Sequence, residues 1–170
     1  QAAIWMCDLR GFTSMTREIG SFAMIDIMNQ YFDCMAQAVW NEGGEVLKFM
    51  GDAMLAVFPI ADGQNEKDAA QCAVRAASGA IEGLHALSLQ REQEQHSPLH
   101  AGIAIHLGAV VYGNIGAITR LDFTVMGNAV NLVARIQNLT SRLDEAVLFS
   151  KEVAIHVHPN CKSIGSHSFK

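Results

Sequence analysis

The stretch that decides the fold reads Glu45-Val46-Leu47-Lys48-Phe49-Met50-Gly51-Asp52-Ala53-Met54-Leu55-Ala56-Val57-Phe58. Two apolar segments, 45–49 and 53–58, surround the short turn Met50-Gly51-Asp52. Apolar runs of this length around a glycine-containing turn are typical of a β-hairpin. The hairpin is therefore the centre from which the neighbouring elements are assigned.

A helix pattern and then an apolar strand pattern stand on each side of the hairpin. The preceding helix ends at Gly43-Gly44 and follows a strand at 2–7, and the helix at 69–84, rich in alanine, leads to a strand at 99–106. The order βαββαβ predicts an α+β fold with a ferredoxin-like core and with its helices on one face of the sheet. The core-facing stripe of the first helix is expected to comprise Ile25, Met28, Phe32, Met35 and Val39.

The remainder of the chain predicts elements added to this core. They are strands at 109–115, 121–126 and 146–149 and helices at 127–139 and 151–156. No repeat or linker divides the sequence, so residues 1–170 are expected to form a single domain. Because the first strand starts almost at the first residue and the last segment has no clear terminus, we expect a domain of a longer protein with an upstream regulatory domain.

Composition excludes several classes of protein. Twelve Lys and Arg against seventeen Asp and Glu give a formal net charge of −5. The chain therefore lacks the excess of basic residues that is typical of nucleic-acid-binding proteins. With 50% hydrophobic and 17% charged residues, the chain is expected to fold rather than stay disordered. The apolar runs are too short for a membrane span. The sequence has no secretory signal pattern and no C-x-x-C pair, so we expect a cytoplasmic domain with reduced thiols. Membrane attachment of the full-length protein stays open.

Two aspartates are candidate metal ligands. Asp8 ends the first buried strand, and Asp52 lies in the turn of the central hairpin. Carboxylate oxygens suit Mg²⁺ or Mn²⁺, and two such ions about 3.5–4 Å apart can assist phosphoryl transfer. Either aspartate alone is explained more simply as a turn residue.

Two further stretches could bind a nucleotide. The turn at 10–13 enters a helix and offers backbone N–H groups to phosphate, although by itself an ordinary strand–turn–helix connection explains it better. Asn131 and Arg135 are four residues apart on an expected helix and therefore share a face. The amide of Asn131 and the guanidinium of Arg135 could hold a ribose and a polyphosphate. From their spacing alone, the simpler interpretation is the exposed polar edge of an amphipathic helix.

Taken together, the segments 8–13, 48–53 and 124–135 resemble the catalytic domain of class III nucleotide cyclases, the adenylate and guanylate cyclases. The resemblance runs from about residue 2 to residue 149, and the three motifs together are highly specific. It implies a cyclase homology domain acting as an antiparallel homodimer, because each site in this family lies between two chains. One chain supplies the aspartates and the other the base-binding and ribose-binding residues. This sequence contains both sets.

The resemblance also implies a role for each matching residue. Asp8, Asp52 and the Leu9 carbonyl match the ligands of two Mg²⁺ or Mn²⁺ ions. Asn131 matches the residue that orients the ribose, and Arg135 the one that stabilises the transition state. The positions that hold the triphosphate or read the base are Leu9, Arg10, Gly11, Phe12, Thr13, Lys48 and Thr124.

The base-reading pair favours ATP. Guanylate cyclases of the family carry Glu with Cys or Ser at these positions, whereas this sequence has Lys48 and Thr124. A lysine ammonium donates hydrogen bonds and cannot accept them, which suits adenine N1 and disfavours the guanine N1–H. The expected reaction converts ATP to 3′,5′-cyclic AMP and pyrophosphate for intracellular signalling.

One position departs from the family pattern. The family often carries Arg-x-Gly-x-His on a strand, and Gly102 stands in the place of that arginine, four residues before His106. Glycine cannot replace a guanidinium that holds phosphate, so Arg10 is the expected alternative source of this contact. Guanylate cyclase activity and a degenerate nucleotide-binding or dimerisation module are the alternative functions. The missing arginine argues weakly for the second of them.

Overall fold

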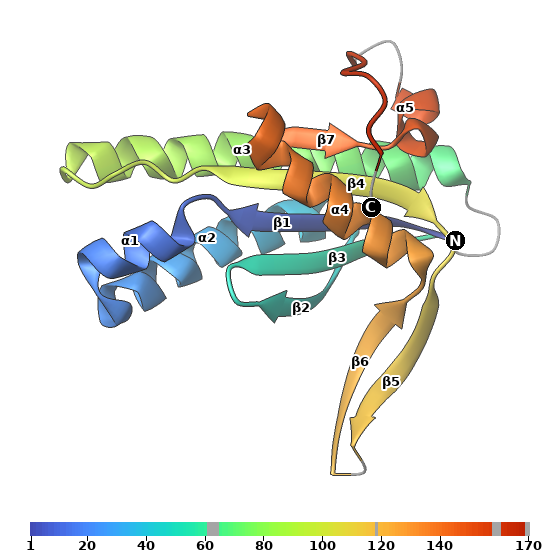
Figure 1. Cartoon of the computed structure of the whole chain (residues 1–170), viewed down its shortest axis with the longest axis horizontal. Coiled ribbons are helices and arrows are strands. Elements are labelled where there is room, and N and C mark those ends of the chain that lie inside the picture. Colours follow the sequence, from blue (N-terminus) through green and yellow to red (C-terminus); the bar gives the residue numbers. More distant parts are fainter. Residues whose placement is uncertain (61–64, 118, 158–160, 169–170) are drawn as a thin grey trace.

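The computed structural model describes residues 1–60, 65–117, 119–157 and 161–168. A five-stranded sheet lies between two layers of helices, and a two-stranded hairpin extends away from it (Figure 1). The elements in chain order are β1 (Ala2–Leu9), α1 (Phe12–Ile19), α2 (Ser21–Asn41), β2 (Glu45–Met50), β3 (Ala53–Pro59), α3 (Glu66–Gln93), β4 (Ala101–Gly108), β5 (Val111–Ala117), β6 (Arg120–Met126), α4 (Asn128–Leu143), β7 (Val147–Phe149) and α5 (Lys151–Val157).

The main sheet has the ferredoxin-like arrangement that the sequence predicts. Its strand order is β2-β3-β1-β4-β7, and β1 pairs antiparallel with both β3 and β4. The added strand β7 pairs parallel with β4. In this register Asp8 lies opposite Ala53 on one side and Gly102 on the other. The last residues of β1 therefore lie at the centre of one end of the sheet.

Both faces of the sheet are covered, so the prediction that the helices lie on one face was wrong. Trp5 and Cys7 of β1 pack into a core that includes α2 and α3. Ile4 and Met6 point the other way and pack with α4 residues such as Val133. Successive residues of a strand point to opposite faces, and the unbroken apolar run of β1 therefore needs cover on both sides.

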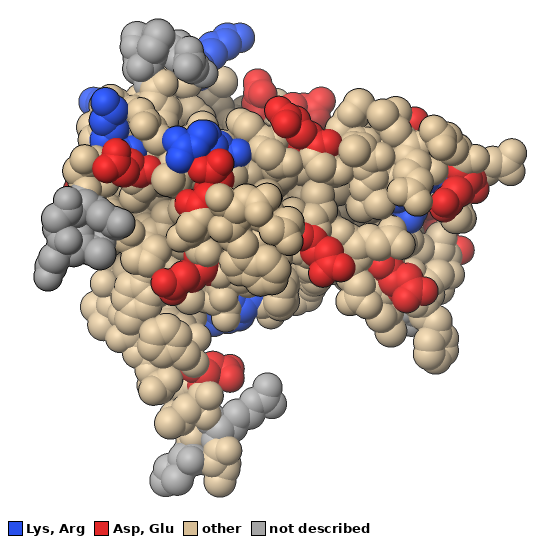
Figure 2. All heavy atoms as spheres, turned by 180° about the vertical axis from the view of Figure 1, so that it is seen from behind, with Lys and Arg blue, Asp and Glu red and all other residues tan. Residues whose placement is uncertain are grey.

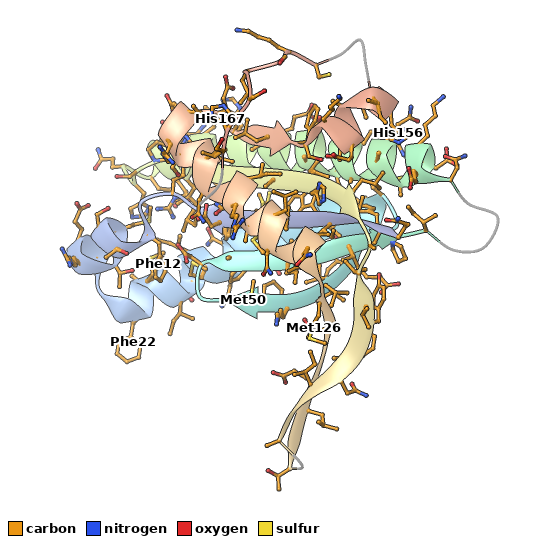
Figure 3. All side chains as sticks on the ribbon, turned by 45° about the vertical axis from the view of Figure 1, so that its right-hand side comes forward. Phe12, Phe22, Met50, Met126, His156 and His167 are labelled. Carbon is orange, nitrogen blue, oxygen red and sulfur yellow. The ribbon has the colours of Figure 1, made fainter. Side chains whose placement is uncertain are left out.

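The buried stripe of α2 also differs from the predicted one. Met35 and Val39 are buried as expected, but Met24 and Tyr31 are buried in the first half of the helix, where Ile25 is 55% exposed. This half carries more apolar residues than one face can bury, and spacing alone does not identify the buried set. Ile25 stays on the outer side together with Phe22, which points away from the protein (Figure 3).

The hairpin of β5 and β6 forms an arm that is separate from the main sheet. Its register joins Val111 to Met126 at the base and Ala117 to Arg120 at the other end. The arm touches β2 and the start of α4 near its base and then extends away from the body (Figure 1). Its exposed large apolar side chains are Val111, Tyr112, Ile115, Leu121, Phe123 and Met126. Single exposed apolar residues are ordinary, but a series on one projecting hairpin indicates a contact surface.

Among the described residues, no helix is both long enough and apolar enough to cross a bilayer.

The contact between α4 and β4 requires a glycine. A Cβ atom at Gly102 would overlap the Oγ1 of Thr140 and would lie 3.5 Å from the Asp8 Oδ1. Thr140 is fully buried and donates its hydroxyl hydrogen to the Gln137 carbonyl oxygen at 2.8 Å. Thr140 is therefore held in place and cannot easily make room for a side chain on β4.

We predict opposite effects of alanine at two glycines. Gly102→Ala is expected to lower the free energy of unfolding by about 1–3 kcal/mol because it overpacks this contact. Gly79→Ala, in the interior of α3 with no atom within 4 Å of the new Cβ, is expected to raise it by about 0.5–1 kcal/mol through helix propensity. Urea unfolding of both variants measures the difference. A neutral Gly102→Ala would contradict the proposed close approach.

Candidate functional site

The two candidate aspartates meet at one end of the sheet. Asp8 lies near the end of β1, and Asp52 lies in the β2–β3 turn, where the Leu9 N–H donates to the Asp52 carbonyl oxygen at 3.2 Å. Both line one pocket of about 430 Å³. The other lining residues are Leu9, Arg10, Gly11, Phe12, Thr13, Ser14, Arg17 and Ser141. The structure therefore brings together the predicted metal ligands and the predicted phosphate-binding turn.

Asp8 has the electrostatic surroundings of a cation ligand. Its Oδ1 is buried and has no hydrogen-bond partner among the described residues. Burial, followed by the charge of Asp52, raises the pKa of the Asp8 carboxyl to about 6, and the Gln137 amide and the Arg10 charge offset only part of this effect. A cation between the two carboxylates would remove this cost of ionisation.

The donor set fits Mg²⁺ or Mn²⁺ rather than a metal that needs many protein ligands. Within the described part of the chain, no group of three or more His, Cys, Asp or Glu side chains is arranged to hold a metal. Two carboxylates and a backbone carbonyl leave coordination positions for water and phosphate oxygens. Mg²⁺ is commonly bound in this way, by one or two carboxylates together with the phosphates of a substrate.

The turn after β1 presents a helix N-terminus to the pocket. Gly11 has φ 74°, a left-handed conformation that glycine adopts without strain, and it directs the chain into α1. No side chain caps the N–H groups at the start of α1. Uncapped N–H groups and the positive end of the helix dipole favour an anion, so the pocket combines a site for cations with a site for phosphate.

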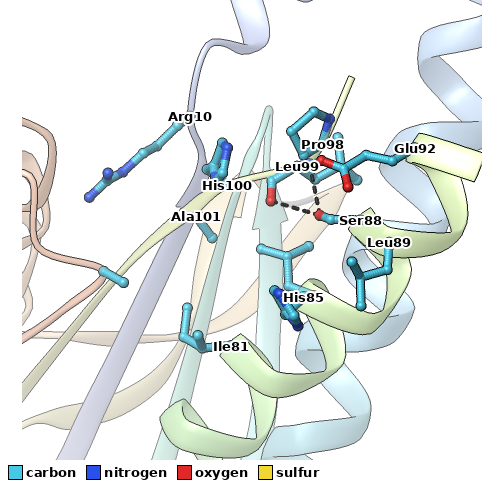
Figure 4. A pocket seen from close by; sticks show the side chains of 12 residues that line it. Arg10, Ile81, His85, Ser88, Leu89, Glu92, Pro98, Leu99, His100 and Ala101 are labelled. Carbon is cyan, nitrogen blue, oxygen red and sulfur yellow. Dashed lines mark hydrogen bonds between the residues drawn. The ribbon is translucent and has the colours of Figure 1, made fainter. Parts of the chain in front are cut away.

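Arg10 makes contacts within the protein that speak against its expected role in place of the missing strand arginine. Its guanidinium donates to the Asp144 carboxylate at 2.9 Å and to the carbonyl oxygens of Thr140 at 2.9 Å and Glu145 at 2.8 Å. Its backbone N–H donates to the His100 carbonyl oxygen at 2.8 Å. In the neighbouring cavity between α3 and β4, the Arg10 side chain extends away from His85 and Ser88 (Figure 4). Arg10 thus binds the end of α4 rather than facing a ligand.

The remaining predicted site residues lie outside this pocket. Lys48 is on β2, and β2 contacts β6, the strand that contains Thr124. Asn131 and Arg135 are both exposed on α4, as their spacing predicts. Asn131 precedes the pocket residue Ser141 by ten positions, which is about 15 Å along a helix axis. We call Lys48, Thr124, Asn131 and Arg135 the outer group.

Thr124, a member of the outer group, has a buried hydroxyl without a hydrogen-bond partner among the described residues. The residue is 6% exposed. A buried hydroxyl without a partner is costly and marks a place where a ligand could supply one.

Three pocket residues, Ser14, Arg17 and Ser141, were not predicted as site residues from the sequence. Ser141 comes from the last turn of α4, 133 positions from Asp8, and no local pattern identifies it. Arg17 had a usable signal, because it follows Thr13 by four positions and therefore shares its helix face.

The face of the protein seen in Figure 2 does not have the basic surface that nucleic-acid binding requires. On the face seen in Figure 2, Lys and Arg side chains lie among Asp and Glu side chains and form no continuous basic surface. This agrees with the net charge of −5.

Comparison with known proteins gives consistent matches over nearly the whole chain. Residues 1–164 match the family described as the adenylate and guanylate cyclase catalytic domain. An adenylate cyclase of Anabaena cylindrica is 34% identical over 154 residues, which cover 88% of this chain and 29% of that protein. A bacterial light-regulated adenylyl cyclase has a TM-score of 0.86 at 28% identity, over 98% of this chain and 48% of that one. The guanylyl cyclase Cya2 has a TM-score of 0.83 at 29% identity, over 99% of this chain and 84% of that one.

The buried carboxyl of Asp8 predicts a pH-dependent change in stability. Its pKa rises from 3.8 to about 6 in the folded chain, so its ionisation opposes folding as the pH rises through this range. In metal-free buffer, Asp8→Asn is expected to raise the free energy of unfolding by about 1–2 kcal/mol at pH 8, after allowance for partial exposure, and to change it little at pH 4.

Urea unfolding at the two pH values provides the measurement. Asp33→Asn, on the exposed side of α2, controls for the substitution itself. A gain of equal size at pH 4 and pH 8 would show that removal of the charge is not its cause.

Proposed function

We propose that this chain, which belongs to the family of adenylate and guanylate cyclase catalytic domains, converts ATP to 3′,5′-cyclic AMP and pyrophosphate for intracellular signalling. The observation that carries the proposal is the pocket in which Asp8 and Asp52 meet the uncapped N-terminus of α1. A pair of carboxylates beside an anion-binding helix end suits a metal-bound polyphosphate.

Asp8, Asp52 and the Leu9 carbonyl would hold two Mg²⁺ or Mn²⁺ ions. When bound, such ions lower the pKa of the substrate 3′-hydroxyl and neutralise phosphate charge. The N–H groups of Gly11, Phe12 and Thr13 bind the triphosphate. The N–H of Arg10 is not available to it because it already donates to His100.

The chemical step exchanges one phosphorus–oxygen bond for another. The ribose 3′-oxygen attacks the α-phosphorus, the bond from that phosphorus to the bridging oxygen of the β-phosphate breaks, and pyrophosphate leaves with the electron pair. The proton of the 3′-hydroxyl passes to water. Arg135 balances the charge that develops on the α-phosphoryl oxygens, an effect worth roughly 10²–10³ in rate by analogy with oxyanion donors. Asn131 orients the ribose.

A complete site needs two copies of the chain. The outer group does not line the pocket that contains Asp8 and Asp52, so in the proposed arrangement one copy supplies the pocket and the other supplies the outer group. In a homodimer with two-fold symmetry, each copy gives its outer group to the pocket of the other. The exposed apolar side chains of the β5–β6 arm, such as Leu121 at 57% and Phe123 at 55% exposure, supply a surface for this association.

Base selection rests on Lys48 and the buried hydroxyl of Thr124. Lys48 donates to adenine N1, and the base supplies Thr124 Oγ1 with the hydrogen-bond partner that it lacks among the described residues. The matched proteins include one named adenylate cyclase and one named guanylyl cyclase, so the preference for ATP depends on these two side chains.

The chain spans less than a third of the length of the Anabaena relative. We therefore propose that it acts within a longer cytoplasmic or membrane-attached protein whose other domains regulate the cyclase.

The proposed activity and its base preference can be tested together. Incubated with Mn²⁺ and ATP, the purified chain is expected to form cyclic AMP, and with GTP it is expected to form at least tenfold less cyclic GMP. Asp52→Asn is expected to abolish both products. Lys48→Glu combined with Thr124→Cys is expected to reverse the ATP-to-GTP preference, because a carboxylate accepts from the guanine N1–H. Product chromatography measures the reaction of each of the three proteins with each nucleotide.

Absence of product from the folded, dimeric wild type would contradict the proposed activity and favour a nucleotide-binding module. An unchanged preference in the double variant would contradict only the assignment of the base-reading pair.

Complementation tests the shared site. Asp52→Asn and Arg135→Ala are each expected to be inactive, but an equal mixture should recover about a quarter of the wild-type activity. Half of the randomly paired dimers contain both variants, and each of these has one intact site. No recovery after subunit exchange, verified by labelled chains, would show that each site is built within one copy.

A further inference from the structure

Arg17 is a pocket residue that the proposed reaction does not yet use. It lies in the last turn of α1 and lines the pocket of Asp8 and Asp52. It follows Ser14 and Thr13 by three and four positions and so lies on their face of the helix. Long side chains in a helix point toward its N-terminus. We therefore expect the Arg17 guanidinium to be directed toward the uncapped end of α1.

The other basic side chain that lines the pocket is already engaged elsewhere. Arg10 lines the same pocket, but its guanidinium donates to the end of α4. The neighbouring β4 position is Gly102, and Thr140 lies where its side chain would begin. Among the described residues that line the pocket, Arg17 is the cation with no hydrogen bond or ion pair to another residue.

We propose that the Arg17 guanidinium binds the terminal phosphates of the nucleoside triphosphate, the part that leaves as pyrophosphate. This inference rests on the proposed function, because it assigns a ligand to the same pocket. The planar guanidinium offers paired N–H donors that match phosphate oxygens, and it adds charge to the neutral N–H groups at the start of α1. Arg17 and the helix end then hold the phosphates, and the carboxylates Asp8 and Asp52 line the same pocket.

A purely structural role makes a different prediction. A basic residue in the last turn of a helix stabilises the helix by interacting with its dipole. Loss of that interaction lowers thermal stability slightly and leaves the affinity for phosphate unchanged. Arg142, in the last turn of α4 and outside the pocket lining, offers a matched control.

The test uses inorganic pyrophosphate with Mn²⁺ as the probe and calorimetry as the measurement, because binding does not require turnover. Arg17→Gln is expected to weaken pyrophosphate binding about tenfold to a hundredfold, the range for a lost charge-assisted hydrogen bond. Arg17→Lys is expected to recover part of the loss. Affinity for cyclic AMP, which has no terminal phosphates, should not change, and Arg142→Gln should bind pyrophosphate as the wild type does.

The outcomes separate this inference from the proposed function. If the wild type forms cyclic AMP and Arg17→Gln retains pyrophosphate affinity, the role of Arg17 is overturned and the cyclase activity stands. If Arg17→Gln loses that affinity and the wild type forms no cyclic nucleotide, the role of Arg17 stands and the cyclase activity fails. Equal weakening in Arg17→Gln and Arg142→Gln, or no pyrophosphate binding by the wild type, also overturns the inference.

Discussion

The hydrogen bonds from the Arg10 guanidinium to Thr140, Asp144 and Glu145 join the segment after β1 to the end of α4 at the candidate site. Arg10 follows the end of β1 directly, and its partners lie where α4 ends. Carbonyl groups at a helix C-terminus have no partners within the helix, and a guanidinium satisfies them well. This contact fixes the end of α4 over the sheet and brings Ser141 to the pocket. The close approach of Thr140 to Gly102 in turn depends on this placement of α4.

The same contact explains why the pocket contains so few basic side chains. Arg10 is used to hold the fold together, and Gly102 is required by the packing of Thr140. In the proposed complex, phosphate charge is therefore met by backbone N–H groups, by metal ions at Asp8 and Asp52, and by Arg17. A chain with a net charge of −5 can accept a polyanion in this way because the attraction is local.

The sequence predicted the parts of the structure that local pattern controls. The central hairpin, the order of the core strands and the meeting of Asp8 with Asp52 follow from apolar runs and turn chemistry. The side of α4 shared by Asn131 and Arg135 follows from helix spacing. Contacts between distant segments were not predictable in this way. The partners of Arg10 lie 130 to 135 positions further along the chain, and the rotation of α2 that leaves Ile25 exposed depends on which side chains the sheet can accept.

The uncovered apolar arm of β5 and β6 bears on how turnover per chain would depend on the concentration of the protein. If the arm associates copies that share each site, dilution separates them, and turnover per chain falls as monomers accumulate. Tethering or clustering two copies would raise their effective concentration and restore turnover without any change inside the pocket. The arm would then let the level and crowding of the protein itself set the strength of its signal.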